Sequence, residues 1–342
     1  MAKLKDIASQ LKVSVSTVSR VVNNQNRVDP DTRKRILDAL KKYDYQPDQN
    51  ARSLKTNVAK VLGVIVPDIS NPFYATVIKG IERVASLNGY TVILCNTDEN
   101  KQRERDATQL LLRQKVAGLI VATTFSGPEA QQVYLPVERP VVFFDNVPAT
   151  AREINSVTIN NTRAARELTE FMIRRGHRRI FLIAGPAGES SSDERQQGWR
   201  LALEAAGIEP GADWFSHGDF REESGREIME DFLRRPQADR PTAVCIANNF
   251  MAYGAVKAVL DQGLDIPGDL SVAAFDIIDT TGLLKLCITT VQQPAADIGA
   301  LAAELCLQDN TRQGIRFSQR LVLEHQFCPN SSVSPIDPDS QP

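Results

Sequence analysis

Short hydroxyl side chains and one arginine gather in VSVSTVSRVVN, the stretch from Val13 to Asn23. Ser16 and Thr17 can both donate and accept hydrogen bonds at short range, and Arg20 adds a charged donor. Such groups suit the edges of base pairs in the major groove of DNA, where longer side chains would crowd the approach. The same stretch holds five valines, so it needs an element that separates the hydroxyls from an apolar seam.

Polar and aromatic residues form a second set, at the ends of apolar runs further along the chain. Asp68, Asp145 and Asp276 each lie at the end of such a run, and Asn248 and Asn249 follow another. Carboxylates and amides bond hydroxyl groups, and aromatic rings cover the C–H faces of sugars. The nearby aromatic residues are Phe73, Tyr74, Phe144 and Phe220. This mixture indicates a site for a small polyhydroxylated molecule, although each residue could instead simply cap a helix or a turn.

The elements that position the first set are short helices. Apolar residues repeat at helical spacing at Leu4, Ile7, Ala8 and Leu11. Ser14 can cap a second helix, from Val15 to Asn23, by accepting a backbone N–H bond. In that helix the apolar seam that faces the first helix consists of Val18, Val21 and Val22. The opposite side then presents Ser16, Thr17, Arg20 and Asn23.

A third helix is expected after Asp29, which can act as its cap, with Pro30 in the first helical position. Its apolar stripe is Ile36, Leu37, Leu40 and Tyr43. Three short helices, the first two joined by a tight turn, are typical of a helix-turn-helix module that reads DNA. The alternative is a small helical bundle with a solvated polar face.

The charge distribution separates these two interpretations. The first 60 residues hold 13 Lys and Arg against 6 Asp and no Glu, a net charge of +7, so the remaining 282 residues carry −9. A basic segment on an acidic body indicates that the first sixty residues meet a polyanion and that the rest does not. The sequence therefore favours the DNA-binding interpretation.

After Lys60 apolar strands alternate with amphipathic helices. The strands are VLGVIV, YTVILC, GLIVA and PVVFFD, followed by RRIFLIAG, TAVCIAN and LSVAAFD, and the helices are expected over 73–88, 102–114, 194–206 and 250–262. This alternation predicts an α/β fold with a doubly wound parallel sheet, and its restart near Asn160 predicts two such lobes in tandem. Two lobes of this kind bind a ligand in the cleft between them, at the carboxyl ends of the strands.

Several classes of protein are disfavoured. The five cysteines are scattered without a C-x-x-C pair, and the chain has three histidines, so we expect no metal site and a reducing, cytoplasmic setting. No signal peptide or membrane-spanning run is apparent. The glycines of GPAGESSSDER fit neither the G-x-G-x-x-G nor the G-K-[ST] phosphate-binding pattern, which argues against an enzyme and for the absence of a cofactor.

The basic N-terminal segment, which we call the head, resembles a known family. DIASQLKVSVSTVSRVVN, followed by RVDPDTRKRILDALKKYDYQPDQNARSLK, is similar to the DNA-binding head of the lactose-repressor (LacI/GalR) family. The resemblance implies a hinge helix after the tyrosine and proline, whose leucine enters the minor groove of the operator. It places the DNA contacts on Val15, Ser16, Thr17, Arg20, Asn23, Arg27, Ala51 and Leu54. An exposed leucine in a short polar stretch would also be unusual without a partner.

The resemblance continues through the body to about Cys328, in SNPFY, LIAGP, ERQQGW, IPGDLSVAAFD and ITTVQQP. It implies an effector-binding core like that of periplasmic sugar-binding proteins, with three crossovers between the lobes, near Asn160, Thr290 and Arg320. The implied effector contacts are Asn71, Phe73, Tyr74, Asp145, Arg195, Phe220, Asn248, Asp276 and Gln293. Two departures concern the pocket and a loop: Asn249 stands where the family usually has aspartate, and Leu286 and Cys287 stand where it usually has two prolines.

The predicted organisation is a helix-turn-helix head at 1–46, a hinge helix or linker at 47–58, a two-lobe effector-binding and dimerisation core at 59–328, and a disordered tail at 329–342. The lobes are expected at about 59–160 plus 291–320, and at 161–290 plus 321–328. The tail is rich in Pro, Ser and Asp and lacks a leucine heptad, so we expect a homodimer rather than a tail-mediated tetramer.

Together these features predict a DNA-binding transcriptional regulator, most simply a repressor. Its expected partners are a palindromic double-stranded operator, a second copy of the chain and a sugar, sugar acid or sugar phosphate as effector. A ligand that promotes DNA binding remains an alternative, because the sign of the coupling depends on which conformer the ligand prefers. A transport-binding protein is a further alternative, which the basic head disfavours.

Overall fold

The computed structural model describes residues 4–22, 28–43, 58–149, 154–277, 287–309 and 318–336. The chain divides into two compact units, residues 1–59 and residues 60–342, and each has its own core. Within the described residues no helix is both long enough and apolar enough to cross a bilayer.

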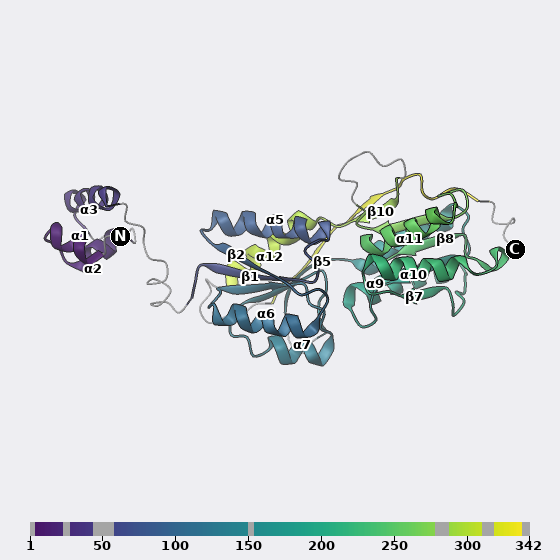
Figure 1. The fold of residues 1–342 in the computed structure, drawn as a ribbon, viewed down its shortest axis with the longest axis horizontal. Coiled ribbons are helices and arrows are strands. Elements are labelled where there is room, and N and C mark those ends of the chain that lie inside the picture. The colour runs from purple at the N-terminus through teal and green to yellow at the C-terminus, as the bar shows by residue number, and fades with distance from the viewer. Residues whose placement is uncertain are drawn as a thin grey trace. The chain divides into compact units, whose positions relative to one another are not determined.

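Among its described residues the first unit contains three helices, α1 (Leu4–Gln10), α2 (Val15–Val22) and α3 (Pro30–Lys42), drawn in purple in Figure 1. Their shared core is built from Ile7, Val18 and Ile36, all fully buried. The predicted caps are confirmed: the backbone N–H of Thr17 donates to Ser14 Oγ at 3.1 Å, and that of Thr32 donates to Asp29 at 3.0 Å.

The prediction is wrong for one residue of the apolar stripe in α3. Leu37 is 44% exposed, whereas Ala39, Leu40 and Tyr43 pack against the core with Ile36. Counting from Ile36, these three lie at the i+3, i+4 and i+7 positions of one helical face. Leu37 is only one residue further, which turns its side chain about 100° away from that face.

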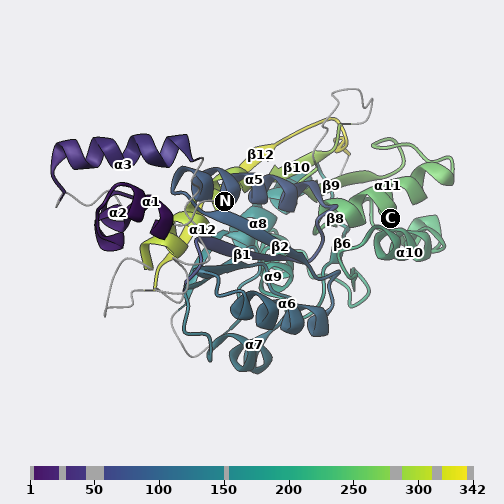
Figure 2. The ribbon, with the colours of Figure 1, turned by 60° about the vertical axis from the view of Figure 1, so that its left-hand side comes forward.

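The second unit holds two six-stranded sheets, each covered by helices on both faces. The first sheet is entirely parallel, in the order β11-β5-β4-β3-β1-β2. Its strands are β1 (Val61–Val66), β2 (Thr91–Asn96), β3 (Gly118–Val121), β4 (Val141–Phe144), β5 (Asn155–Ile159) and β11 (Arg320–Leu323). Its helices are α5 (Pro72–Leu87), α6 (Lys101–Arg113), α7 (Gly127–Tyr134) and α12 (Ala295–Asp309). Figures 1 and 2 show α5 and α12 on one face of this sheet and α6 and α7 on the other.

The second sheet has the order β12-β10-β9-β8-β6-β7, and among the described strands only β10 and β12 pair antiparallel. Its strands are β6 (Ile180–Ala184), β7 (Phe215–His217), β8 (Ala243–Ile246), β9 (Ser271–Phe275), β10 (Thr289–Gln292) and β12 (Gln326–Cys328). Its helices are α8 (Asn161–Arg174), α9 (Ser190–Ala205), α10 (Glu222–Leu233) and α11 (Asn249–Asp261), with a short 3-10 helix at Gln237–Asp239. Helices α8 and α9 pack together, as do α10 and α11.

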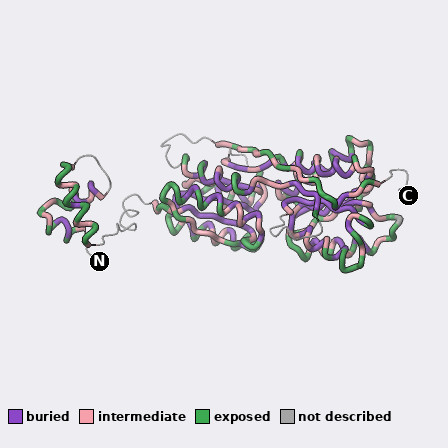
Figure 3. Tube along the Cα trace, turned by 90° about the horizontal axis from the view of Figure 1, so that it is seen from above, coloured by how far each residue is buried: buried purple, intermediate pink, exposed green. Residues whose placement is uncertain are grey.

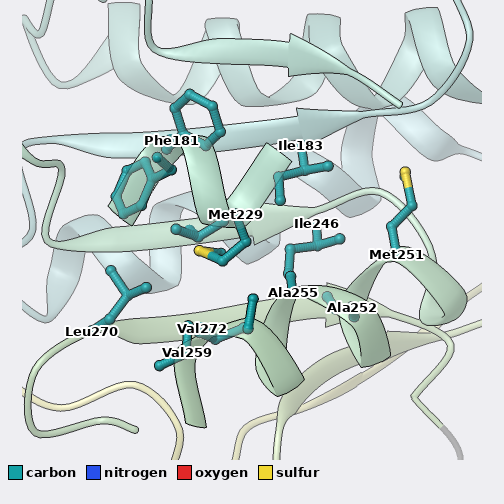
Figure 4. Packing of buried hydrophobic residues seen from close by; sticks show 14 of the residues in the cluster. Phe181, Ile183, Met229, Ile246, Met251, Ala252, Ala255, Val259, Leu270 and Val272 are labelled. Atoms are coloured by element: carbon teal, nitrogen blue, oxygen red, sulfur yellow. The ribbon is translucent and has the colours of Figure 1, made fainter. Parts of the chain in front are cut away.

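Strand alternation explains how this second sheet is covered on both faces. Phe181 and Ile183 of β6 point to the same face and pack with Met229 of α10 and Met251 of α11 (Figure 4). Residues between them, such as Leu182, face the other way and are equally buried. Figure 3 shows the result: buried residues lie inside each lobe, and exposed residues concentrate on its outer surface. Both predicted doubly wound lobes are therefore present, and we call them the first lobe and the second lobe.

The first crossover between the lobes follows β5 at Asn160, near the predicted place, and the other two come slightly later than predicted. Val291 still pairs with Phe275 in the second sheet, so the chain leaves that sheet after Gln292 rather than near Thr290. Leu323 pairs with Ile159 in the first sheet, so the last crossover follows it rather than lying near Arg320. Each strand completes its hydrogen-bonded ladder before the chain crosses, because an edge left unpaired inside the protein would bury unsatisfied backbone groups.

The prediction of a disordered tail from Pro329 is wrong for residues 329–336. Ser332 is fully buried, accepts a hydrogen bond from the backbone of Thr289 at 2.7 Å and donates to the carbonyl of Val272 at 2.6 Å. The N–H of Ile336 donates to the carbonyl of Arg175 at 2.8 Å. The polar composition of this stretch supplies hydrogen bonds to the second sheet, which composition alone does not reveal. Residues 337–342 lie outside the described residues.

Candidate functional site

A cavity lies between the two lobes, at the carboxyl ends of both sheets. Asp68 follows β1 and Asp145 follows β4 in the first lobe, while Asn248 follows β8 and Asp276 follows β9 in the second. All nine effector contacts implied by the family resemblance line this one cavity. They are Asn71, Phe73, Tyr74, Asp145, Arg195, Phe220, Asn248, Asp276 and Gln293.

Arg195, on α9, is the buried cation of the cavity, with 3% of its surface exposed. Its Nε donates to Asn161 Oδ1 at 2.9 Å, one terminal nitrogen donates to the carbonyl of Ala247, and the guanidinium lies 4.1 Å from the ring centre of Phe275. The other terminal nitrogen, Nη2, has no hydrogen-bond partner among the described residues. A buried donor without a partner is costly, so Arg195 is poised to donate to a ligand.

Two aspartates accompany Arg195, of which Asp276 is buried and Asp145 half-buried. Asp276 accepts hydrogen bonds from the backbone N–H of Gln293 at 2.9 Å and from its side-chain amide at 2.7 Å. Asp145 accepts the hydroxyl of Tyr74 at 2.8 Å. Burial raises the pKa of both carboxyl groups, and the positive charge of Arg195 partly offsets that rise. The site therefore holds carboxylates that gain stability when a ligand donates hydrogen bonds to them.

The backbone around the cavity is unusually strained. Glu99, Asp145, Phe220 and Asp276 all adopt positive φ, between 55° and 65°, which residues with a side chain rarely do. At Phe220 this conformation brings the ring against Gly185, where any Cβ would lie 2.1 Å from a ring carbon. Strained conformations of this kind cluster at ligand sites, because they aim side chains that relaxed loops would point elsewhere.

Hydrogen bonds join the two lobes. The amides of Asn71 and Asn249 donate to each other, at 3.0 and 2.9 Å. The hydroxyl of Ser190 donates to Asn146 Oδ1 at 2.8 Å. The described conformation is therefore one in which the lobes are closed on each other.

Several residues of the cavity are absent from the set that the resemblance implied. Glu99, Ser191, Arg221 and Phe250 also line it, together with the strand-end residues Asp68 and Asn249. Glu99 could have been found, since it lies in a loop directly after a predicted strand. Arg221 follows the three-residue strand β7, which has no detectable sequence pattern. Phe144, considered above as a nearby aromatic, does not line the cavity: it is buried behind Tyr74, with 6.2 Å between ring centres.

In the head, α2 places its apolar and its polar residues on different sides, as the spacing predicted. Val18 and Val21 are buried, whereas Ser16 and Arg20 are exposed, Thr17 is half-buried and Val15 is 43% exposed. The cap hydroxyl of Ser14 lies 2.7 Å from those of both Ser16 and Thr17. These residues form a polar face at the start of α2, the geometry that a recognition helix presents to a major groove. The other predicted DNA contacts, Asn23, Arg27, Ala51 and Leu54, lie outside the described residues.

Comparisons with known proteins cover both units. Residues 3–48 match the model for bacterial regulatory proteins of the lacI family. Residues 59–324 match the model for periplasmic binding proteins and the sugar-binding domain of the LacI family. The solved structure of the Lac repressor dimer bound to operator and the anti-inducer ONPF is similar to the whole chain. Its TM-score is 0.84 at 26% sequence identity, over 97% of this chain and 99% of that chain.

Two similar proteins extend over nearly the full length of the chain. Catabolite control protein A of Priestia megaterium is 34% identical over 301 residues, which cover 88% of this chain and 90% of that protein. The HTH-type transcriptional repressor CytR of Escherichia coli strain K12 is 34% identical over 324 residues, or 94% of this chain and 93% of that protein. With the helix-turn-helix head, the two lobes and these matches together, the chain belongs to the LacI family of bacterial transcriptional regulators.

Proposed function

We propose that this chain is a cytoplasmic transcriptional repressor whose affinity for an operator is controlled by a small molecule in the cavity between its lobes. The observation that carries the proposal is the combination, in one chain, of an exposed polar face on α2 and a cavity lined from both lobes. Its relatives are DNA-binding transcriptional regulators, and the chain is a regulator rather than an enzyme.

The cavity allows a ligand to control the affinity for the operator. Asn71 and Asp145 come from the first lobe, while Arg195 and Asn248 come from the second, so a ligand that contacts all four binds only when the lobes are closed. A ligand shifts a conformational equilibrium by its difference in affinity for the two states. Binding therefore stabilises the closed arrangement of the lobes. Operator affinity changes if the closed and the open lobes hold the DNA-binding heads differently.

The operator is expected to be palindromic. A single helix-turn-helix head reads only a few base pairs, and two heads related by a two-fold axis double the length of the site. The solved Lac repressor structure that resembles this chain is a dimer on its operator. We therefore propose a homodimer in which each copy contributes one α2 to the major groove and one hinge leucine, Leu54, to the centre of the site.

The experiment that tests this proposal begins with selection of DNA sites from genomic fragments by the purified full chain. Recovery of a palindromic consensus, bound by two copies per site, supports the proposal. Fluorescence anisotropy on that site, with and without a deproteinised extract of small molecules, then shows whether a ligand lowers or raises the affinity. A lowered affinity identifies an induced repressor, and a raised affinity identifies a corepressor mechanism. Selection without any shared sequence would contradict the proposal.

A further inference from the structure

A second pocket lies in the second lobe, at the opposite end of its sheet from the cavity between the lobes. Arg179 directly precedes β6, Thr242 directly precedes β8 and Leu270 directly precedes β9, and all three residues line this pocket. The pocket therefore lies at the amino ends of these strands. Its volume is about 570 Å³, which is within the range of small-molecule sites.

Basic residues are concentrated in the two segments that supply guanidinium groups to this pocket. Residues 174–179 contain four arginines and no acidic residue, and residues 234–240 contain three arginines and one aspartate. By contrast, residues 61–342 as a whole carry a net charge of −9. One arginine from each segment lines the pocket, Arg179 from the first and Arg240 from the second.

The lining also includes one carboxyl group, on Asp269. This residue is exposed, and one of its carboxyl oxygens accepts the backbone N–H of Asp265 at 2.7 Å. Two guanidinium groups against one carboxyl group leave positive charge in excess, which favours an anion over a cation in the pocket.

Arg240 is held in place and still has donors to offer. Its Nε donates to the carbonyl of Arg235 at 2.6 Å, and the residue is half-buried. Arg235 is fixed in turn, because its guanidinium lies 5.7 Å from the ring centre of Phe232 and pairs with Asp213 at 3.2 Å. Within the described part of the chain, the terminal nitrogens of Arg240 have no hydrogen-bond or acidic partner. The planar fork that they form matches the oxygens of a carboxylate or a phosphate.

Apolar side chains supply much of the remaining lining. Phe232, Leu233 and Leu270 belong to the buried core of the second lobe, and Leu264 packs against that core. A ligand with an apolar body would cover the part of this surface that water still reaches, which stabilises the bound state. Gln237 adds an exposed amide that can both donate and accept.

We infer that the second lobe contains a further binding site, at the amino ends of β6, β8 and β9, for a small organic anion that joins a carboxylate or phosphate group to an apolar body. The anionic group accepts hydrogen bonds from Arg240, and the apolar body lies against the core side chains. Among the described residues none lines both this pocket and the cavity between the lobes. Binding here is therefore separate from the proposed function.

Isothermal titration calorimetry on the full chain tests the site with four probes. Phenyl phosphate and benzoate carry both an anionic group and a ring, inorganic phosphate carries only the anion, and benzamide carries only the ring. We expect at least one of the two aromatic anions to bind once per chain, at least ten-fold more tightly than inorganic phosphate and benzamide. Absence of binding by both aromatic anions at millimolar concentration would overturn the inference. Equal affinity for inorganic phosphate or for benzamide would overturn it too.

Variants show where the anion binds. Arg240→Ala removes the guanidinium, and Gln237→Glu adds a negative charge at an exposed position of the lining, so each should raise the dissociation constant at least five-fold. Arg234→Ala is the matched control and should change it less than two-fold, because Arg234 is exposed and pairs with Asp231 instead of lining the pocket. The melting temperature of each variant checks that it is folded. Unchanged affinity in either folded pocket variant, or an equal loss in the control, would show that the anion binds elsewhere and would overturn the inference.

Discussion

Asn71 and Asn249 exchange two hydrogen bonds across the boundary between the lobes, with each side-chain amide donating to the other at 3.0 and 2.9 Å. Asn71 is the cap of α5 in the first lobe and Asn249 is the first residue of α11 in the second. Both are buried, with 8% and 1% of their surface exposed, so water does not compete for the pair. The pair is neutral, since both side chains are amides.

This pair should couple energetically. Asn71→Ala and Asn249→Ala each leave the other amide without its partner, so the double variant should lose less stability than the sum of the two single variants. We expect a coupling free energy of about 1 kcal/mol, within the range for residues in direct contact. A double-mutant cycle by urea denaturation measures it. Additivity within error would indicate that the lobes are not held by this pair in solution.

Arg20 is predicted to read a base. Arg20→Ala should weaken operator binding by about 1–3 kcal/mol and change binding to random DNA little, because a base-edge contact is made only at the specific site. Arg20→Lys is the matched control, since it keeps the charge and loses the planar fork. Anisotropy titrations on both DNAs check this. Equal losses on operator and random DNA would assign Arg20 to a phosphate contact.

Leu54 is predicted to act on DNA and not on folding. Leu54→Ala should leave the melting temperature unchanged but reduce both operator affinity and operator bending. A wedge between base steps costs a few kcal/mol of stacking, which closer contact with the bent DNA offsets. Thermal denaturation and a bending assay with permuted fragments test both parts. A variant that bends and binds DNA like the parent would refute the hinge assignment.

Arg195 and Asp276 are predicted to serve the ligand and not the operator. Arg195→Ala and Asp276→Ala should fold, dimerise and bind operator, yet fail to respond to the effector, since hydrogen bonds to charged groups contribute about 1.5–3 kcal/mol each. Arg200→Ala, an exposed position on the same helix, is the control and should respond normally. In an induced repressor the two pocket variants would stay on DNA. Release at the parental effector concentration would contradict the pocket assignment.

Stability should fall as the pH rises through neutrality, owing in part to Glu189. Burial and the nearby carboxyl groups of Glu99, Asp145 and Glu104 raise the pKa of Glu189 to about 9, with Lys101 opposing them. The folded state then holds a proton that the unfolded state has lost above its ordinary pKa of 4.5. This contribution is complete below about pH 4.5 and is lost progressively up to about pH 9.

The variant Glu189→Gln cannot titrate, so its melting temperature should fall less than that of the parent between pH 5 and pH 9. Glu82→Gln, at an exposed position, should follow the parental profile. Differential scanning calorimetry at matched ionic strength makes the comparison. Parallel profiles for Glu189→Gln and the parent would show that Glu189 is ionised in the folded protein.

Local sequence signals determined the helices and strands of this protein. Ser14 and Asp29 cap helices because their side chains accept the free N–H groups of a first turn, which needs no distant residue. Continuous apolar runs such as Val61–Val66 become buried parallel strands for a similarly local reason. The rule that ligands bind at the carboxyl ends of such strands, together with the family resemblance, was enough to gather nine residues around one cavity.

Other features were decided only in three dimensions. Leu37 is as apolar as Leu40, and only the packing of α3 on Ile7 and Val18 decides which one is buried. The polar tail around Ser332 is ordered because its hydroxyl meets the backbone of Thr289 and Val272, forty or more residues away. Likewise Glu99 and Arg221 meet at the cavity, and Asn71 meets Asn249, only because the crossovers bring the carboxyl ends of the two sheets to face each other. Hydrophobic periodicity and capping are properties of neighbours along the chain, whereas the contacts of Ser332 and of Asn71 join residues between 43 and 178 positions apart.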